Sequence, residues 1–225
     1  MKLQYKIDLD RDIDNWQKSF SRISYGLKWN KFIPEDLNPV CLKDRNRLSD
    51  YVQKKFYKTN LINIFLEWLK KNVDIKQIQA DLESITGEKF DYGKIGVYLT
   101  TFHRAPYNFQ KKYFYLIYQN KNKTGSIRSI YHELFHFYFH EHYMDQIKNK
   151  YGSEKANQLK ESLTVILNDV LPKRLLPPDK GYPEHKILRE QIKRIWQKEK
   201  NLDSTIRKTL PYLSHNLSEV DNSVN

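Results

Sequence analysis

The sequence predicts an α+β protein that is mostly helical, with a small mixed β-sheet ahead of one long, buried helix. Apolar residues recur at helical spacing over most of the chain, whereas two short segments are rich in β-branched and aromatic residues, as strands are. Only 7 glycines and 8 prolines occur among 225 residues, which favours helices over a loop-rich fold. Aromatic residues make up 14% of the chain, a share typical of folded proteins.

The N-terminal part is predicted to be one strand followed by helices. Residues 3–9 alternate strictly between apolar and polar, which indicates a half-buried strand. Apolar side chains stand at helical spacing within residues 12–30 and again, twice, within 43–71. A further helix is expected over 75–86, with Gly87 as its stop.

The C-terminal part is predicted to be two strands followed by three helices. Residues 94–102 and 112–119 are the two strand-like segments, joined by a loop. Helices are expected over 126–149, 153–170 and 184–200. From this order we expect three parts: a strand and helices over 1–92, a zincin-like catalytic core over 93–213, and a flexible polar tail over 214–225.

Composition limits the class of protein. The net charge is +12, but it is spread thinly and no nucleic-acid-binding motif is present. One cysteine excludes an intramolecular disulfide framework. No apolar run approaches the roughly 18–20 residues of a membrane span, and the N-terminus has no apolar signal segment. We therefore expect a cytoplasmic protein without a membrane span.

Residues 132–136 read His-Glu-Leu-Phe-His, the HExxH motif. His132 and His136 share one helix face, about 6 Å apart along the axis, so both imidazoles can bind one Zn²⁺. Glu133 lies beside the same opening and can take a proton from a water molecule activated by the metal. The surrounding helix is almost wholly apolar, and a buried glutamate flanked by histidines needs a partner.

A third metal ligand must come from elsewhere. His140 shares the helix face but lies about 12 Å along the axis from His132, so we expect it to line the site without completing it. His142 has the metzincin spacing, but Phe139 stands where those enzymes have glycine, and no later methionine follows Met144. We favour Glu161 on the next helix, which gives a His₂Glu zinc set, with Glu154 as the alternative carboxylate.

Two segments together resemble a known family. IYHELFHFYFHEHY (130–143) followed by LKESLTVILND (159–169) resembles the gluzincin branch of the zincin metallopeptidases. Residues 94–170 look like an uncharacterised bacterial group of small HExxH proteins with a later GYPEH-type loop. The resemblance implies a zincin-like fold, a zinc cofactor and a peptide or protein substrate, with His132, His136 and Glu161 as ligands and Glu133 as general base.

The resemblance also raises questions about supporting residues. Thermolysin-like members carry an aspartate four residues after the ligand glutamate, but Val165 stands there, so Thr164 or Asn168 is expected to support a ligand histidine instead. The oxyanion of the reaction needs a donor, for which Tyr182 or His185 of the GYPEH loop is predicted.

Two other functions compete with a zinc metallopeptidase (a hydrolase). The segment HELFHFYFH also resembles the ImmA/IrrE group, regulatory proteases that act on a specific protein partner. The alternative from a different class is a non-enzymatic basic binding protein whose metal is structural or absent.

Overall fold

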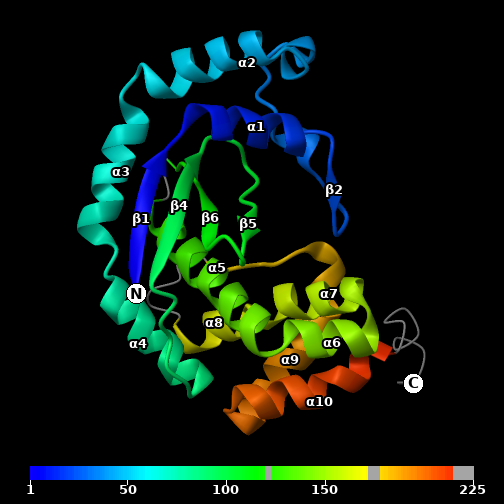
Figure 1. Cartoon of the computed structure of the whole chain (residues 1–225). Helices are drawn as coiled ribbons and strands as arrows, with labels where there is room; N and C mark the ends of the chain where they lie inside the picture. The colour runs from blue at the N-terminus through cyan, green and yellow to red at the C-terminus, as the bar shows by residue number, and fades with distance from the viewer. Residues whose placement is uncertain (120–122, 172–177, 215–225) are drawn as a thin grey trace. The chain divides into compact units, whose positions relative to one another are not determined.

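The computed structural model describes residues 1–119, 123–171 and 178–214 (Figure 1). By its internal contacts the chain divides into two compact units. Unit 1 comprises Met1–Gln77 and Asp91–Ile130, and unit 2 comprises Ile78–Phe90 and Tyr131–Asn225. The prediction of a mostly helical α+β protein with a small mixed sheet is confirmed. The boundary expected after residue 92 concerns independent folding and stays a prediction, and the tail expected over 214–225 lies, apart from residue 214, outside the described residues.

Unit 1 contains a sheet with the strand order β1-β4-β6-β5 (Figure 1). β1, β4 and β6 run parallel, and β5 pairs antiparallel with β6, so the sheet is mixed. The three longer strands confirm the predicted ones, whereas β5 was missed because two residues carry no periodic pattern. The strands are β1 (Lys2–Ile7), β4 (Lys94–Thr100), β5 (Tyr107–Asn108) and β6 (Tyr113–Ile117).

The helices of unit 1 follow the predicted order but with one correction. The helical spacing within 12–30 holds only to Ser19, where α1 ends. Tyr25 and Gly26 then adopt positive φ angles of 48° and 74°, which suit a two-residue hairpin turn between β2 and β3. The elements are α1 (Leu9–Ser19), β2 (Ile23–Ser24), β3 (Leu27–Lys28), η1 (Trp29–Phe32), η2 (Pro39–Leu42), α2 (Arg45–Val52), η3 (Gln53–Tyr57) and α3 (Leu61–Asn72).

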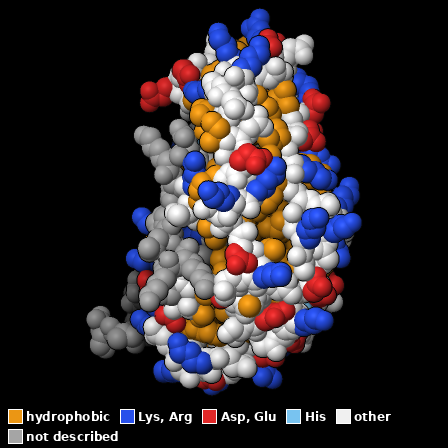
Figure 2. All heavy atoms as spheres, turned by 90° about the vertical axis from the view of Figure 1, so that its left-hand side faces the viewer, with side chains coloured by type: hydrophobic (Ala, Val, Ile, Leu, Met, Phe, Trp, Pro, Cys, Tyr) orange, Lys and Arg blue, Asp and Glu red, His pale blue; other side chains and the backbone are white. Residues whose placement is uncertain are grey.

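The surface of α3 carries apolar as well as polar side chains. Its inner face buries Ile62, Phe65 and Leu69, yet Ile64 is 51% exposed. Figure 2 views the molecule from the side on which α3 lies in Figure 1 and shows hydrophobic side chains exposed among lysines and arginines.

None of the helices in the described part of the chain combines the length and the hydropathy that a membrane crossing requires.

A buried carboxylate ties α1 to the end of β4. Asp12 is 0% exposed and accepts hydrogen bonds from the Thr100 hydroxyl at 2.7 Å and from the Thr101 hydroxyl at 2.7 Å. The backbone N–H of Thr101 donates to the same carboxylate at 2.9 Å, and the indole of Trp16 donates to the Thr101 hydroxyl at 2.9 Å. The Tyr57 hydroxyl also donates to Asp12, at 3.3 Å, so four donors replace the water that this carboxylate loses on folding.

The regular elements in the described part of unit 2 are all helices, and two of its predicted helices are divided. The helix expected over 126–149 is broken at Tyr143, and the helix expected over 153–170 is broken at Thr164. The helix over 75–86 is confirmed, with Gly87 at a φ of 74° after its end. The helices are α4 (Ile75–Thr86), α5 (Thr124–His142), α6 (Met144–Tyr151), α7 (Ser153–Leu163), α8 (Val165–Val170), η4 (Pro183–His185), α9 (Lys186–Glu199) and α10 (Leu202–Ser214); the unit boundary falls within α4 and α5.

The core of unit 2 forms around α5. Leu134, Phe135, Phe137, Tyr138 and Phe139 are each at most 2% exposed, so this helix is buried nearly all round, as its apolar pattern predicts. The helix α10, which the sequence did not predict, packs on α9.

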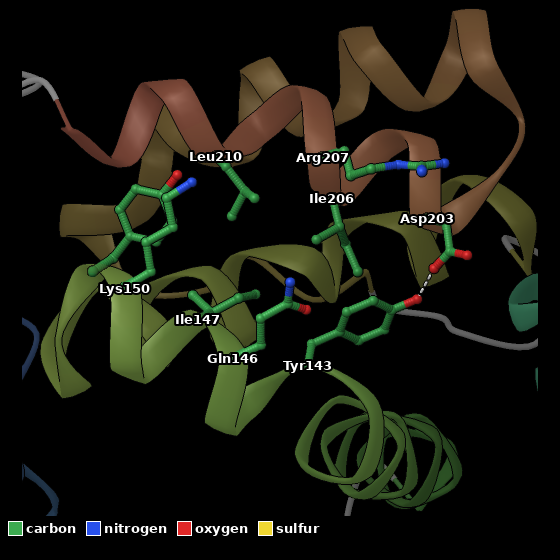
Figure 3. Close-up of a pocket in the computed structure, with 9 residues that line it drawn as sticks. Tyr143, Gln146, Ile147, Lys150, Asp203, Ile206, Arg207 and Leu210 are labelled. Carbon is green, nitrogen blue, oxygen red and sulfur yellow. Dashed lines mark hydrogen bonds between the residues drawn. The ribbon is translucent and has the colours of Figure 1, made fainter.

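A hollow of about 290 Å³ lies beside α6 and α10, where the Tyr143 hydroxyl donates to the Asp203 carboxylate (Figure 3).

We expect D12A to destabilise the protein by roughly 2–4 kcal/mol, because four donors around the buried carboxylate lose their acceptor. Urea unfolding followed by circular dichroism measures this change. D10A is the matched control, since the Asp10 side chain is 90% exposed and its ion pair with Arg45 is worth little. Equal unfolding midpoints for the two variants would contradict the role of Asp12.

Candidate metal centre

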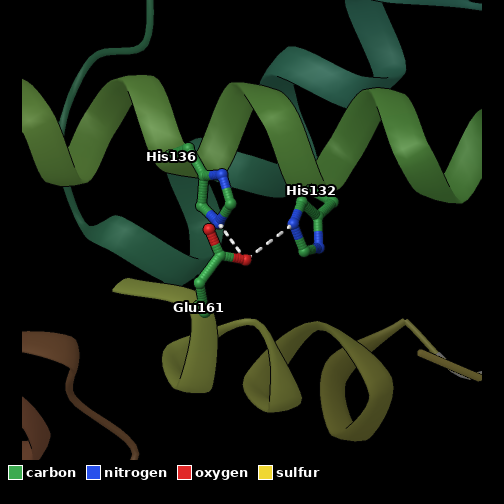
Figure 4. A group of neighbouring side chains, drawn as sticks. All are labelled: His132, His136 and Glu161. Carbon is green, nitrogen blue, oxygen red and sulfur yellow. Dashed lines mark ion pairs between the residues drawn. The ribbon is translucent and has the colours of Figure 1, made fainter. Parts of the chain in front are cut away.

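Two helices of unit 2 bring the predicted ligand trio together. α5 carries His132 and His136 one turn apart, and α7 carries Glu161 in its last turn (Figure 4). One carboxylate oxygen, Oε2 of Glu161, lies 3.5 Å from Nε2 of His132 and 3.6 Å from Nε2 of His136. All three ligand atoms lie within 4.8 Å of one another. Ligand atoms around a tetrahedral zinc ion stand about 3.3–3.6 Å apart, so the two distances from Glu161 to the histidines already match that arrangement.

The side chains of this cluster are largely withdrawn from water. His136 is 1% exposed and Glu133 7%, while the side chains of Glu161 and His132 keep 12% and 22% exposure. Oε2 of Glu133 is buried and has no hydrogen-bond partner among the described residues, and Nδ1 of His136 lies 3.8 Å from it. Such burial is costly unless a cation lies nearby. Two imidazole nitrogens and one carboxylate therefore fit a zinc ion with one position open.

The protonation states in the metal-free protein follow from burial and charge. Burial would lower the pKa of His132, but hydrogen bonds to Asp179 and Glu161 raise it to about 10. Burial holds the pKa of His136 well below its ordinary value. Burial would raise the pKa of Glu161, but His136, Lys160 and His132 hold it well below its ordinary value. A metal ion that binds here must therefore displace one proton, from His132.

Asp179 is a functional residue that the sequence reasoning missed. Its Oδ2 lies 3.2 Å from Nδ1 of His132, on the opposite side of the ring from the Nε2 that faces Glu161. A carboxylate at Nδ1 fixes the tautomer of a metal-binding histidine and turns its other nitrogen toward the metal. The one local signal is the sequence Asp179-Lys180-Gly181, in which the Gly181 N–H donates to Oδ1 of Asp179 at 3.0 Å, a turn arrangement typical of aspartate.

Thr164 and Asn168, which were expected to support a ligand histidine, contact Asp179. The amide of Asn168 donates to the Asp179 carbonyl at 2.6 Å and accepts from the Asp179 N–H at 2.9 Å. The hydroxyl of Thr164 lies 3.0 Å from Oδ2 of Asp179. Their support for His132 therefore passes through Asp179 rather than acting on the ring directly.

Arg189 of α9 donates hydrogen bonds to Asp179, Thr164 and Glu161. It is 5% exposed and donates to the Asp179 carbonyl at 2.8 Å, to the Thr164 hydroxyl at 2.9 Å and to the Glu161 carbonyl at 3.2 Å. Gly181 makes room for it, because a Cβ there would stand 2.7 Å from Nε of Arg189, and the φ of +67° favours glycine as well.

Lys160 determines which oxygen of Glu161 faces the histidines. It is 3% exposed, and its ammonium lies 2.9 Å from Oε1 of Glu161. Because Oε1 is engaged, Oε2 is the oxygen that meets both Nε2 atoms. The ammonium also offsets part of the negative charge that Glu133, Glu161 and Asp179 bring to the site.

The remaining predicted residues lie around this cluster. His185 is 1% exposed, its ring lies 5.5 Å from that of Tyr182, and burial lowers its pKa to about 4. Burial likewise lowers the pKa of His140 to about 4, and the charges of Lys160 and Glu161 act on this ring. The proposed donor role of Tyr182 or His185 stays a prediction.

The two alternative third ligands lie outside the cluster. His142 contacts Glu88 at 3.4 Å and Glu141 at 3.6 Å instead of the other histidines. Glu154 is exposed in the first turn of α7. The grouping of ligand-forming side chains within the described residues contains Glu161 and neither alternative.

Comparisons of the chain with protein-family models, with curated proteins and with solved structures find no match. The resemblance to the gluzincins therefore stays a prediction that rests on the two motifs. The support for a metal centre comes from the geometry of His132, His136 and Glu161, with Asp179 behind the first histidine.

We expect about one zinc per chain in protein purified without added metal, and a loss of that zinc in E161A, because the variant lacks one of three ligands. Elemental analysis measures the ratio. E154A is the matched control and should keep the zinc of the wild type, since its carboxylate lies outside the cluster. Equal zinc in E161A and E154A would contradict the assigned ligand set.

D179N should bind zinc roughly 10–100-fold more weakly, because His132 loses the carboxylate that orients it. The variant should also release fewer protons at pH 7.5, since the pKa of about 10 of His132 depends on Asp179. Because His132 must lose its proton to bind zinc, the zinc affinity of the wild type should rise with pH between 6.5 and 10, and less so in D179N.

Calorimetry in buffers of different ionisation enthalpy measures the zinc affinity and the number of protons released. Asp145 is exposed on α6, so D145N is the control. Release of as many protons by D179N as by the wild type would refute the coupling between Asp179 and His132.

Proposed function

We propose that this protein is a zinc-dependent metallopeptidase of gluzincin type, in which Glu133 is the general base. The observation that carries the proposal is the position of Glu133, buried next to His136 and next in sequence to His132 at the His₂Glu cluster. Zinc, when bound, supplies a Lewis acid that polarises a carbonyl and lowers the pKa of a water molecule.

Glu133 is suited to move protons near neutral pH. Burial raises its pKa to about 7 in the metal-free protein, so its carboxyl group can accept and release a proton in that range. In peptide hydrolysis it would take a proton from the attacking water and pass it to the nitrogen of the leaving amine. One group then serves both as base and as acid, and the proton count balances.

Other residues of the site hold the ligands for this task. Asp179 keeps the Nε2 of His132 available, and Lys160 keeps Oε2 of Glu161 turned toward both histidines. Arg189 links Asp179 to the backbone of the segment that carries Glu161. Ligands held in advance need little rearrangement when metal or substrate binds, which favours catalysis as well as binding.

The donor for the oxyanion is proposed to come from Tyr182 or His185. With a pKa of about 4, His185 is neutral at neutral pH and would donate through a ring N–H rather than as an imidazolium. The Tyr182 hydroxyl is a donor over the same range. The rings of Tyr182 and His185 lie 5.5 Å apart at the two ends of η4, so both candidate donors belong to the same short segment.

E133Q should retain about one zinc per chain and lose at least about 100-fold of the peptidase rate, because the amide cannot accept the proton. The rate is measured with a fluorogenic peptide library on zinc-loaded protein. E141Q, an exposed glutamate of the same helix, should keep the wild-type rate.

Two results would count against the proposal in different ways. A wild-type rate in E133Q would remove Glu133 as the general base. Zinc-loaded protein that cleaves no peptide in the library would leave the metal centre in place and reject the broad peptidase activity.

A further inference from the structure

Unit 1 contains a second hollow, independent of the metal centre, with cationic walls. Its volume is about 440 Å³, within the range of small-molecule sites. One side of α1 and the residues after it form one wall, the loop after β4 forms another, and β6 closes the third. The residues that line it are Arg11, Asp14, Asn15, Lys18, Arg22, Arg104, Pro106, Tyr113 and Tyr115.

The lining has an excess of positive charge. Four of its side chains are cationic and one, Asp14, is anionic. Asp14 is already paired, with Arg45 of α2 at 2.5 Å and with Lys18 at 3.3 Å. Asp8, outside the lining, lies 3.5 Å from Arg11 and compensates it in part. The lining therefore keeps a net positive charge that an anionic ligand can neutralise.

Neighbouring groups hold the cations in position. The guanidinium of Arg11 lies 4.1 Å from the centre of the Tyr98 ring and 5.4 Å from that of Tyr113. Arg104 donates to the Ser19 hydroxyl at 3.3 Å. Nε of Arg22 donates to the Lys18 carbonyl at 2.8 Å, an anchor that does not use the two terminal nitrogens. Guanidinium groups held in this way are suited to bidentate contacts with phosphate oxygens.

Aromatic side chains of β6 complete the site. Tyr115 is 8% exposed, and the half-buried ring of Tyr113 packs edge-on against Tyr98, with 5.5 Å between ring centres. Buried Asn15 donates to the Thr100 hydroxyl at 2.9 Å and to the Arg104 carbonyl at 2.7 Å, which fixes the loop relative to α1. Tyrosine rings next to cations are the combination that binds a planar base together with its phosphate.

We propose that this hollow binds a mononucleotide, with its phosphate at the arginine and lysine side chains and its base against the tyrosines of β6. The charge of a phosphate monoester, about −2 at neutral pH, is opposite in sign to the excess of positive charge in the lining. The size of the hollow suits one nucleotide rather than a folded partner. This inference does not depend on the proposed peptidase function, because every residue in it belongs to unit 1.

The test is calorimetric titration at low salt with AMP, GMP, CMP and UMP, with adenosine as the uncharged probe. We expect at least one nucleotide to bind, adenosine to bind much more weakly, and binding to weaken as KCl is added. K18Q/R22Q should weaken that binding roughly tenfold. K54Q/K58Q removes the same charge from exposed positions elsewhere in unit 1 and should bind as the wild type does.

Two further arms exclude other sources of the signal. The titrations are repeated in E161A, because a phosphate could bind zinc at the metal centre; binding that disappears in E161A would overturn the proposal. A single-stranded DNA 12-mer is titrated as well, and binding of the 12-mer without binding of any mononucleotide would overturn it. So would equal weakening in K18Q/R22Q and K54Q/K58Q, or no binding of any of the four nucleotides.

Discussion

The cost of burying ionisable groups is the constraint on which unit 2 depends. Glu133, His136 and Lys160 are each at most 7% exposed, in a core formed mainly by aliphatic and aromatic side chains. An isolated charge in such a place is strongly destabilising, whereas a charge with close partners is tolerated. The fold supplies these partners in pairs: Lys160 lies against Glu161, and His132 lies between Glu161 and Asp179. Oε2 of Glu133 has no hydrogen-bond partner among the described residues and lies 3.8 Å from Nδ1 of His136.

Asp179 makes the metal centre a property of more than the two motif helices. It contacts His132 of α5, and it is held by Asn168 of α8 and Arg189 of α9. Arg189 also reaches the carbonyl of Glu161, so the same cation stabilises both sides of the ligand set. The geometry of His132 therefore depends on residues up to 57 positions away in the sequence, and α8 and α9 are part of the site.

In unit 1 the buried carboxylate is stabilised by neutral donors, and the cations lie near the surface. Its buried carboxylate, Asp12, is stabilised by hydroxyl and amide donors from Thr100 and Thr101. Cations of α1 and of the loop after β4 stay at the surface, around the tyrosines of β6. Among the residues that line the hollow, four cations stand against one carboxylate, Asp14, an excess of positive charge that suits an anionic ligand.

Local patterns in the sequence determined the longer strands, most helices and the meeting of two histidines on one helix face. Period and spacing suffice for these features, because they arise from the backbone geometry of single elements. Tertiary structure decided the breaks at Tyr143 and Thr164, across which the apolar pattern continues, and the helix α10, which includes Pro211. It also decided the role of Asp179, 18 residues beyond Glu161 and in no periodic relation to it. A side chain in a loop acquires its partner only when distant helices pack, and no local pattern in the chain records that contact.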